Sequence, residues 1–215
     1  MKQIRTVGLL LMALLAIGAA LASSASAKTV LIGRTAKGPL AKGAELKATS
    51  TNLKFVTSAG NLECTSNVLT GTVSVNEAAK DKGTITEESS TGNEAEKDCK
   101  TTTVLGRTKI EAKGFPWPTE FTTKGANTVK GTKKVAFRSI FPEAGNVECI
   151  FESSKVASKF TVGAHGKPVP VELTTTNQVF KLSKKGSNAA CPKEGKLSGT
   201  FTVSSSGEVV ESELS

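Results

Sequence analysis

Two glutamates occupy matching places in a short repeat, and paired carboxylates are the groups with which glycosidases cleave sugar chains. AGNLEC spans residues 59–64 and AGNVEC spans residues 144–149, so Glu63 and Glu148 are 85 residues apart and each precedes a cysteine. Held about 5 to 10 Å apart, one carboxyl could act as acid and the other as base or nucleophile. Strand alternation, however, turns both glutamates away from the face that carries the cysteines. We therefore expect solvated glutamates, and a polysaccharide hydrolase is the alternative hypothesis.

Trp117, the single tryptophan of the chain, is the other candidate for ligand contact. An exposed Trp would offer a sugar ring a flat surface, whereas a buried one contributes a large apolar area to a core. It lies between two prolines in GFPWP (residues 114–118). Prolines restrict the backbone and remove hydrogen-bond donors, as suits a connector between two β units. We expect Trp117 to be a buried plug at that connector.

Other catalytic chemistry is poorly represented. His165 is the only histidine, and the glycines around it in GAHGKP are typical of a loop. The chain contains no G-x-S-x-G, S-x-x-K or H-E-x-x-H motif and no calcium-binding loop of the EF-hand type. We therefore expect a protein that is not an enzyme and that carries neither a cofactor nor a metal ion.

The first 27 residues have the pattern of a secretory signal peptide. Lys2 and Arg5 precede an apolar run at residues 7–21, and residues 25–27 (ASA) provide the small side chains of a cleavage site. We expect cleavage before Lys28 and a secreted product. The apolar run is shorter than the roughly 20 residues that span a membrane, so a membrane would be contacted only through an uncleaved signal.

Four cysteines remain in the mature chain, and an even number in an exported protein predicts two disulfides. They are Cys64, Cys99, Cys149 and Cys191, with no C-x-x-C spacing to suggest a zinc knuckle. Neither loop-closure entropy nor symmetry selects one of the three pairings. We prefer Cys64 with Cys99 and Cys149 with Cys191, because an ancestral half standing alone would hold only its own two cysteines.

The net charge of +9 is nearly all lysine, and loss of the signal removes two positive charges. The chain has no tyrosine and one Trp, so the stacking side chains of nucleic-acid binders are missing. Nucleic acid is therefore an unsuitable partner. The charge and the expected location favour an anionic cell-wall polymer or a surface glycan.

Short alternating stretches rich in Thr, Val and Phe predict an all-β protein, an antiparallel sandwich or barrel. The expected strands are residues 45–49, 53–57, 68–75, 101–112, 134–140, 156–162, 168–174, 177–182 and 195–204. A helical stub near 76–81 is the best helix candidate. Residues 76–98 are polar and predict an exposed excursion with one short strand at 84–86.

The repeat predicts a hairpin in each half of the mature chain. Each copy reads as strand, Gly-Asn turn and strand, and alternation places Leu62 with Cys64, and Val147 with Cys149, on an inward face. We infer a duplication that relates a first half, residues 28–115, to a second half, residues 116–215. The halves form two domains or pack as one.

The order of these features resembles a group of small secreted four-cysteine proteins from actinobacteria. The features are a leader, a G-N-x-E-C hairpin, a Pro116-Trp117 connector and a C-P-x-x-G motif at residues 191–195. To our knowledge those proteins are uncharacterised, so the resemblance implies no activity.

Taken together, the residues predict a secreted, non-catalytic binding or structural protein associated with the cell wall or a glycan. A third hypothesis is a protein-interaction module that makes contact through residues 76–98.

Overall fold

The computed structural model describes residues 29–91, 98–131, 134–184 and 187–215, and the regular structure there is almost entirely β-strand. The predicted signal peptide lies outside these residues. The strands are β1 (Leu31–Thr35), β2 (Gly38–Pro39), β3 (Glu45–Ser50), β4 (Leu53–Thr57), β5 (Gly60–Cys64), β6 (Ser66–Val75), β7 (Lys80–Thr91), β8 (Lys100–Thr101), β9 (Lys109–Lys113), β10 (Trp117–Thr122), β11 (Ala126–Val129), β12 (Val135–Phe141), β13 (Val147–Ser153), β14 (Val156–Lys159), β15 (Val169–Pro170), β16 (Glu172–Leu182), β17 (Glu194–Ser205), β18 (Glu208–Val209) and β19 (Glu211–Leu214).

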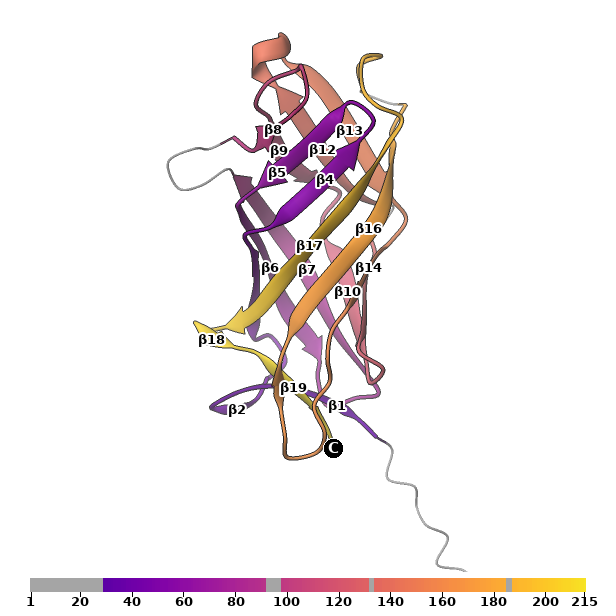
Figure 1. Cartoon of the computed structure of the whole chain (residues 1–215). Helices are drawn as coiled ribbons and strands as arrows, with labels where there is room; N and C mark the ends of the chain where they lie inside the picture. The colour runs from indigo at the N-terminus through magenta and orange to yellow at the C-terminus, as the bar shows by residue number, and fades with distance from the viewer. Residues whose placement is uncertain (1–28, 92–97, 132–133, 185–186) are drawn as a thin grey trace, which may run out of the picture.

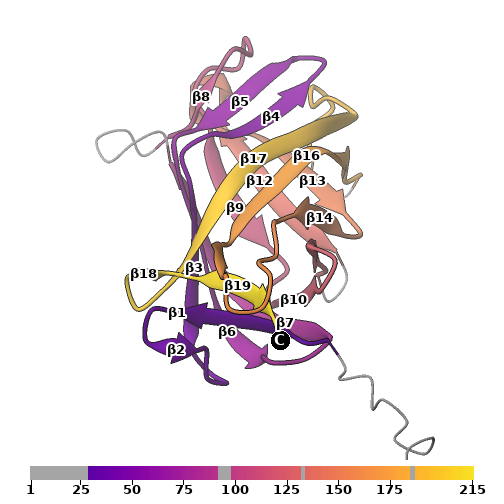
Figure 2. The same ribbon diagram turned by 60° about the horizontal axis from the view of Figure 1, so that its bottom comes forward.

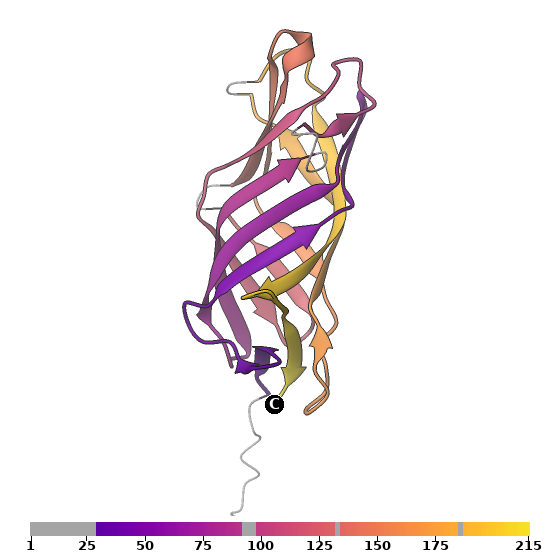
Figure 3. The same cartoon turned by 90° about the vertical axis from the view of Figure 1, so that its left-hand side faces the viewer.

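Eight antiparallel strands close into a barrel in the order β17-β3-β6-β7-β10-β11-β14-β16, and β16 pairs with β17 to complete the ring. The strands run diagonally to the long axis of the molecule (Figures 1 and 3). Such a tilt accompanies barrel closure, which leaves no free edge in the ring. The predicted antiparallel all-β fold is confirmed, and of the two architectures the structure has the barrel.

Two long strands, β16 and β17, extend beyond the ring and change neighbours along their length. The first part of β16 pairs with β14 and its last part with β13, while β17 pairs first with β4 and then with β3. Asn52 lies where β17 changes neighbours, and its Oδ1 accepts the Thr200 N–H at 3.0 Å. β5 and β8 continue the sheet beyond β4, and β12 and β9 continue it beyond β13.

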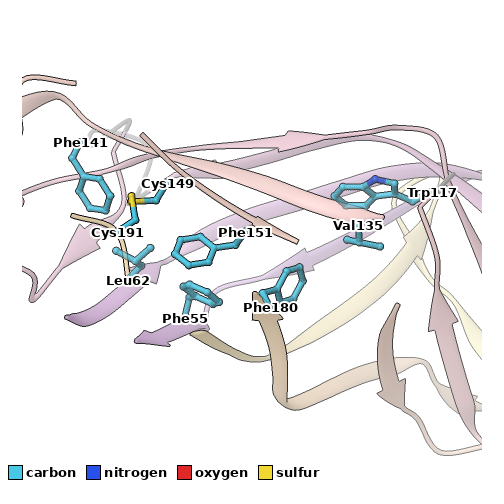
Figure 4. Packing of buried hydrophobic residues seen from close by; sticks show 9 residues of the cluster. All are labelled: Phe55, Leu62, Trp117, Val135, Phe141, Cys149, Phe151, Phe180 and Cys191. Atoms are coloured by element: carbon cyan, nitrogen blue, oxygen red, sulfur yellow. A yellow bond between two sulfur atoms is a disulfide. The ribbon is translucent and has the colours of Figure 1, made fainter. Parts of the chain in front are cut away.

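A phenylalanine cluster fills the space between these two extensions. Phe55 of β4 meets the rings of Phe137 and Phe151, from β12 and β13, with centroids 5.0 and 4.9 Å apart. Phe180 of β16 lies against the same group, and the Cys149–Cys191 disulfide packs beside it (Figure 4). Edge-to-face aromatic contacts of this kind stabilise a core beyond the area they bury.

A second sheet, β15-β19-β1-β2, lies across the opposite end of the barrel (Figure 2). β1 pairs with β19, so the beginning of the described chain is joined to its C-terminal strand. Arg34 forms an ion pair with Glu213 at 2.7 Å across that pairing. Leu31 and Val210 of this region pack on Phe160, Val171 and Val203, which makes a second core at this end.

Both predicted disulfides are present with the preferred pairing, Cys64–Cys99 and Cys149–Cys191. Alternation also places side chains as expected, because Leu62, Cys64 and Cys149 are buried while Glu63 is exposed. The two repeat hairpins differ in their neighbours, however. The opening strand of the first, β4, pairs with β17, whereas the closing strand of the second, β13, pairs with β16. The duplication stays a prediction.

The prediction for residues 76–98 was largely wrong, although the short strand expected at 84–86 lies within β7. No helix forms at residues 76–81, and residues 80–91 form β7, a 12-residue strand of the barrel, in place of an exposed excursion. Residues 92–97 lie outside the described part. The region looked like a loop because Ile85 is the only apolar residue at the inward positions of β7, which otherwise hold Asp81, Gly83, Glu88 and Ser90, so apolar alternation is absent.

Two smaller expectations were also corrected. The strand expected at residues 101–112 is two strands, β8 and β9, separated by residues 102–108. The strands expected at 168–174 and 177–182 largely join into β16, whose register shifts between Thr175 and Gln178. The longer turn of the second hairpin contains a short 3-10 helix, η1 (Pro142–Ala144).

Candidate functional site

The interior of the barrel contains a cavity of about 170 Å³. Most of its lining is apolar, and every strand of the ring contributes to it. The apolar part of the lining includes Leu46, Leu69, Ile85, Trp117, Val129, Val156, Leu173, Phe201 and Val203. An engineered apolar cavity of about 150 Å³ binds benzene, so this space is large enough for a substituted six-membered ring.

Trp117 begins β10 and lies in the wall of this cavity. Its side chain is buried, with only 6% of the residue exposed, and its indole Nε1 donates to the Lys113 carbonyl at 3.2 Å. The ring stacks on Phe115, with centroids 4.3 Å apart. Trp117 therefore offers no surface platform to a sugar, and its contacts are with the core and with the cavity.

One wall of the cavity carries a row of polar side chains on four neighbouring strands. They are Thr119 of β10, Asn127 of β11, Ser158 of β14 and Thr175 of β16, and each is at most 9% exposed. Asn127 lies directly opposite Ser158 in the β11–β14 ladder, and the hydroxyls of Ser158 and Thr175 are 2.7 Å apart. We call these four residues the polar row.

The amide of Asn127 is only half satisfied. Its Nδ2 donates to Thr119 Oγ1 at 2.7 Å and to the Glu120 carbonyl at 3.3 Å. Because a carbonyl can only accept, these contacts fix which end of the amide carries the nitrogen. Its Oδ1, which is fully buried, receives no donor from the residues that the structure describes. An unsatisfied buried acceptor costs about 1 to 3 kcal/mol, so a ligand that donates to it gains affinity.

A second buried amide lies on β6, which is three places from the β11 strand of Asn127 and four from β14 in the eight-stranded ring. Asn67 of β6 donates from Nδ2 to the carbonyls of Ser50 and Cys64 at 3.0 and 2.8 Å. Its Oδ1 also lacks a partner among the described residues. Both amides therefore carry an unpaired acceptor on a residue of the cavity lining.

Glu88 of β7 is the ionisable group of the cavity lining. Burial raises the pKa of its carboxyl above the ordinary value, and hydrogen bonds from the Ser90 hydroxyl and the Ala112 N–H act against that rise. The Ala112 N–H bond, 3.1 Å long, also joins β7 to β9. Glu88 thus adds a hydrogen-bonding group to the cavity while it connects the ring to the extension.

The two glutamates of the repeat lie elsewhere and contact different cations. Glu63 forms an ion pair with Lys54, its direct cross-strand neighbour, at 2.7 Å. Glu148 accepts from Arg138 at 3.2 Å, and Arg138 also contacts Glu111 at 2.6 Å. Neither repeat glutamate is part of the cavity lining. These ion pairs give each glutamate a structural role within its own hairpin.

Features that would suggest other chemistry were also located. His165 lies in an exposed turn, as expected from its flanking glycines. Among the residues with assigned positions, no group of three or more His, Cys, Asp or Glu side chains could hold a metal ion. No helix in the same residues is long and apolar enough to cross a membrane.

Comparison with known proteins identifies no relative. No protein-family model, curated protein sequence or solved structure matches the chain. The resemblance to secreted four-cysteine proteins stays a prediction, and the function must be argued from the cavity.

The polar row and the two buried amides were not predicted from the sequence as parts of a site. A signal was present, because Asn127, Ser158 and Thr175 each stand two residues from an apolar residue that lines the same cavity: Val129, Val156 and Leu173. A polar residue in the apolar phase of a strand indicates an inward polar group. Only barrel closure, however, brings these positions together around one space.

Proposed function

We propose that this protein is an extracellular, non-catalytic binding protein that holds one small, mostly apolar molecule inside its barrel. The observation that carries the proposal is the cavity of about 170 Å³, bounded largely by apolar side chains of all eight ring strands. A small barrel usually fills its interior with side chains, and one that leaves a space can hold a small ligand.

The extracellular location is supported by the two disulfides, since such bonds persist in oxidising compartments. The leader pattern of residues 1–27 points the same way. Association with an anionic cell-wall polymer or a surface glycan stays a prediction from charge, and a pull-down on isolated wall polymers tests it.

The single tryptophan provides a direct test of binding, because Trp117 lines the cavity and is buried. Iodobenzene is an apolar ring of suitable size whose iodine quenches tryptophan fluorescence on contact. We expect saturable quenching at one molecule per chain. Iodide ion quenches in the same way but is charged, so we expect little effect from it on the buried indole.

A pair of variants locates the bound molecule. Ala48 lines the cavity from β3, and Ala48→Phe would fill much of the space, so saturable quenching should disappear. Ala157→Phe makes the same change at an exposed position of β14 and should leave quenching intact. Linear, non-saturable quenching in the wild-type protein, or equal quenching in both variants, would refute binding in the barrel.

A further inference from the structure

We infer that the ligand of this cavity is a small alcohol or phenol whose hydroxyl group binds to the polar row, with Asn127 Oδ1 as the acceptor. This inference rests on the proposed function and specifies the chemistry of the molecule bound. Its basis is the buried amide oxygen of Asn127, which belongs to a residue of the cavity lining and receives no donor from the described part of the chain.

The state of the Asn127 amide selects a hydrogen-bond donor as its partner. Nδ2 is occupied by Thr119 Oγ1 and the Glu120 carbonyl, so the group left for a ligand is a pure acceptor. A ketone, an ether or a plain hydrocarbon would leave that oxygen unpaired. A ligand hydroxyl or N–H satisfies it and removes the cost of burying it alone.

The neighbouring hydroxyls distinguish an alcohol from other donors. Ser158 and Thr175 share one hydrogen bond of 2.7 Å, so one hydroxyl proton of the pair is used between them. The second proton has no acceptor in the hydrogen bonds of the described residues and is available to a ligand oxygen. Because Ser158 is the direct cross-strand neighbour of Asn127, with Cβ atoms about 5 Å apart as in such pairs, one ligand hydroxyl can donate to the amide and accept from the pair.

The rest of the cavity limits the remainder of the ligand. About 170 Å³ accommodates a six-membered ring with one substituent, and the lining away from the polar row is mainly aliphatic and aromatic. An anionic head group is disfavoured, because the described lining contains no Lys, Arg or His side chain and burying an unpaired charge is costly.

The second buried amide is the natural control for this assignment. Asn67 has the same orphaned Oδ1 and the same two Nδ2 bonds to protein acceptors. Its neighbours differ, because the Ser50 hydroxyl donates to Asn52 Oδ1 and the Ser90 hydroxyl donates to Glu88. Those protons are therefore not available to a ligand oxygen. We assign the hydroxyl site to Asn127 on this difference.

The test compares cyclohexanol with methylcyclohexane, which have nearly the same shape but carry a hydroxyl or a methyl group. Both are transparent where tryptophan absorbs, and each is titrated as a competitor of iodobenzene with Trp117 fluorescence as the readout. The measured quantity is the ratio of their dissociation constants, cyclohexanol over methylcyclohexane. In Asn127→Leu we expect this ratio to rise about tenfold over wild type, since only cyclohexanol loses a hydrogen bond.

The matched variant Asn67→Leu should leave the ratio unchanged, although it removes an equivalent buried amide. An unchanged ratio in Asn127→Leu, or an equal rise in Asn67→Leu, overturns the assignment. If Asn127→Leu does not fold, the milder Ser158→Ala/Thr175→Val double variant is measured instead. We expect the ratio of dissociation constants to rise in this variant, and an unchanged ratio would contradict the assignment. A wild-type protein that binds neither competitor nor iodobenzene would instead refute the proposed function itself.

Discussion

At the scale of single residues, buried polar groups distinguish this barrel more than its charges do. Glu63 and Glu148, which first suggested catalysis, are held in ion pairs on partly exposed hairpin faces. Such pairs contribute little to stability, typically below about 1 kcal/mol. The polar groups that matter for the cavity are the amides of Asn67 and Asn127, two lining residues whose Oδ1 atoms have no partner among the described residues.

Asp81 is a buried carboxyl whose titration can be measured. It lies in β7 beside a small space of about 50 Å³ lined also by Leu31 and Phe160. Burial raises the pKa of Asp81 from 3.8 to about 7, opposed by a hydrogen bond from the Ala78 N–H and assisted by the nearby Glu77. The folded protein therefore retains a proton that the unfolded chain releases.

The sign of the resulting pH dependence follows from linkage. Between about pH 4 and pH 7 the folded state binds more protons than the unfolded state at this site, so its contribution to stability falls as the pH rises. Asp81→Asn removes the titration and keeps an oxygen for the Ala78 N–H. We expect the melting temperature of the variant, relative to wild type, to be clearly higher at pH 8 than at pH 4.5. A difference that is the same at both pH values would contradict the assignment.

At the scale of elements, the strands that sequence analysis found and missed differ in what they turn inward. β3, β4, β6 and β12 were predicted because apolar residues alternate along them. β7 was expected only as a short strand at 84–86, because Ile85 is the one apolar residue among its inward positions, and β11 was missed because it is short and turns Asn127 inward. The polar residues of the cavity lining thus interrupt the apolar alternation from which the strands that carry them could have been predicted.

Each disulfide joins a hairpin to a segment that lies further along the sequence. Cys64 of β5 bonds to Cys99, just before β8, and Cys149 of β13 bonds to Cys191, just before β17. Their sequence separations, 35 and 42 residues, are alike. The chain-entropy model therefore gives each bond a contribution of about 4 kcal/mol through the unfolded state.

Removing the second disulfide tests that contribution. Cys149→Ala together with Cys191→Ala should lower the free energy of unfolding by about 4 kcal/mol, measured by urea denaturation under non-reducing conditions. Cys64→Ala with Cys99→Ala should have an effect of similar size. A loss of less than about 1 kcal/mol in both variants would show that the hairpins are held by packing alone.

At the scale of the whole molecule, the cavity is a property of closure that no single strand predicts. The sequence indicated antiparallel strands, two disulfides and a buried Trp117, and the structure has all three. The sequence could not indicate that β16 pairs with β17 and so closes the ring. Both strands also pair with strands outside the ring, β16 with β13 and β17 with β4. The space inside follows from that closure, as does the presence of the two orphaned amides in its lining.

The central claim is that the barrel interior receives a small apolar molecule, and crystals exposed to iodobenzene test it most directly. Iodine scatters anomalously, so its position is measured independently of the surrounding density. We expect one strong iodine site inside the ring, among the side chains that surround Trp117 and Val129. Iodine found only on the outer surface, with the interior filled by the protein's own side chains, would contradict it.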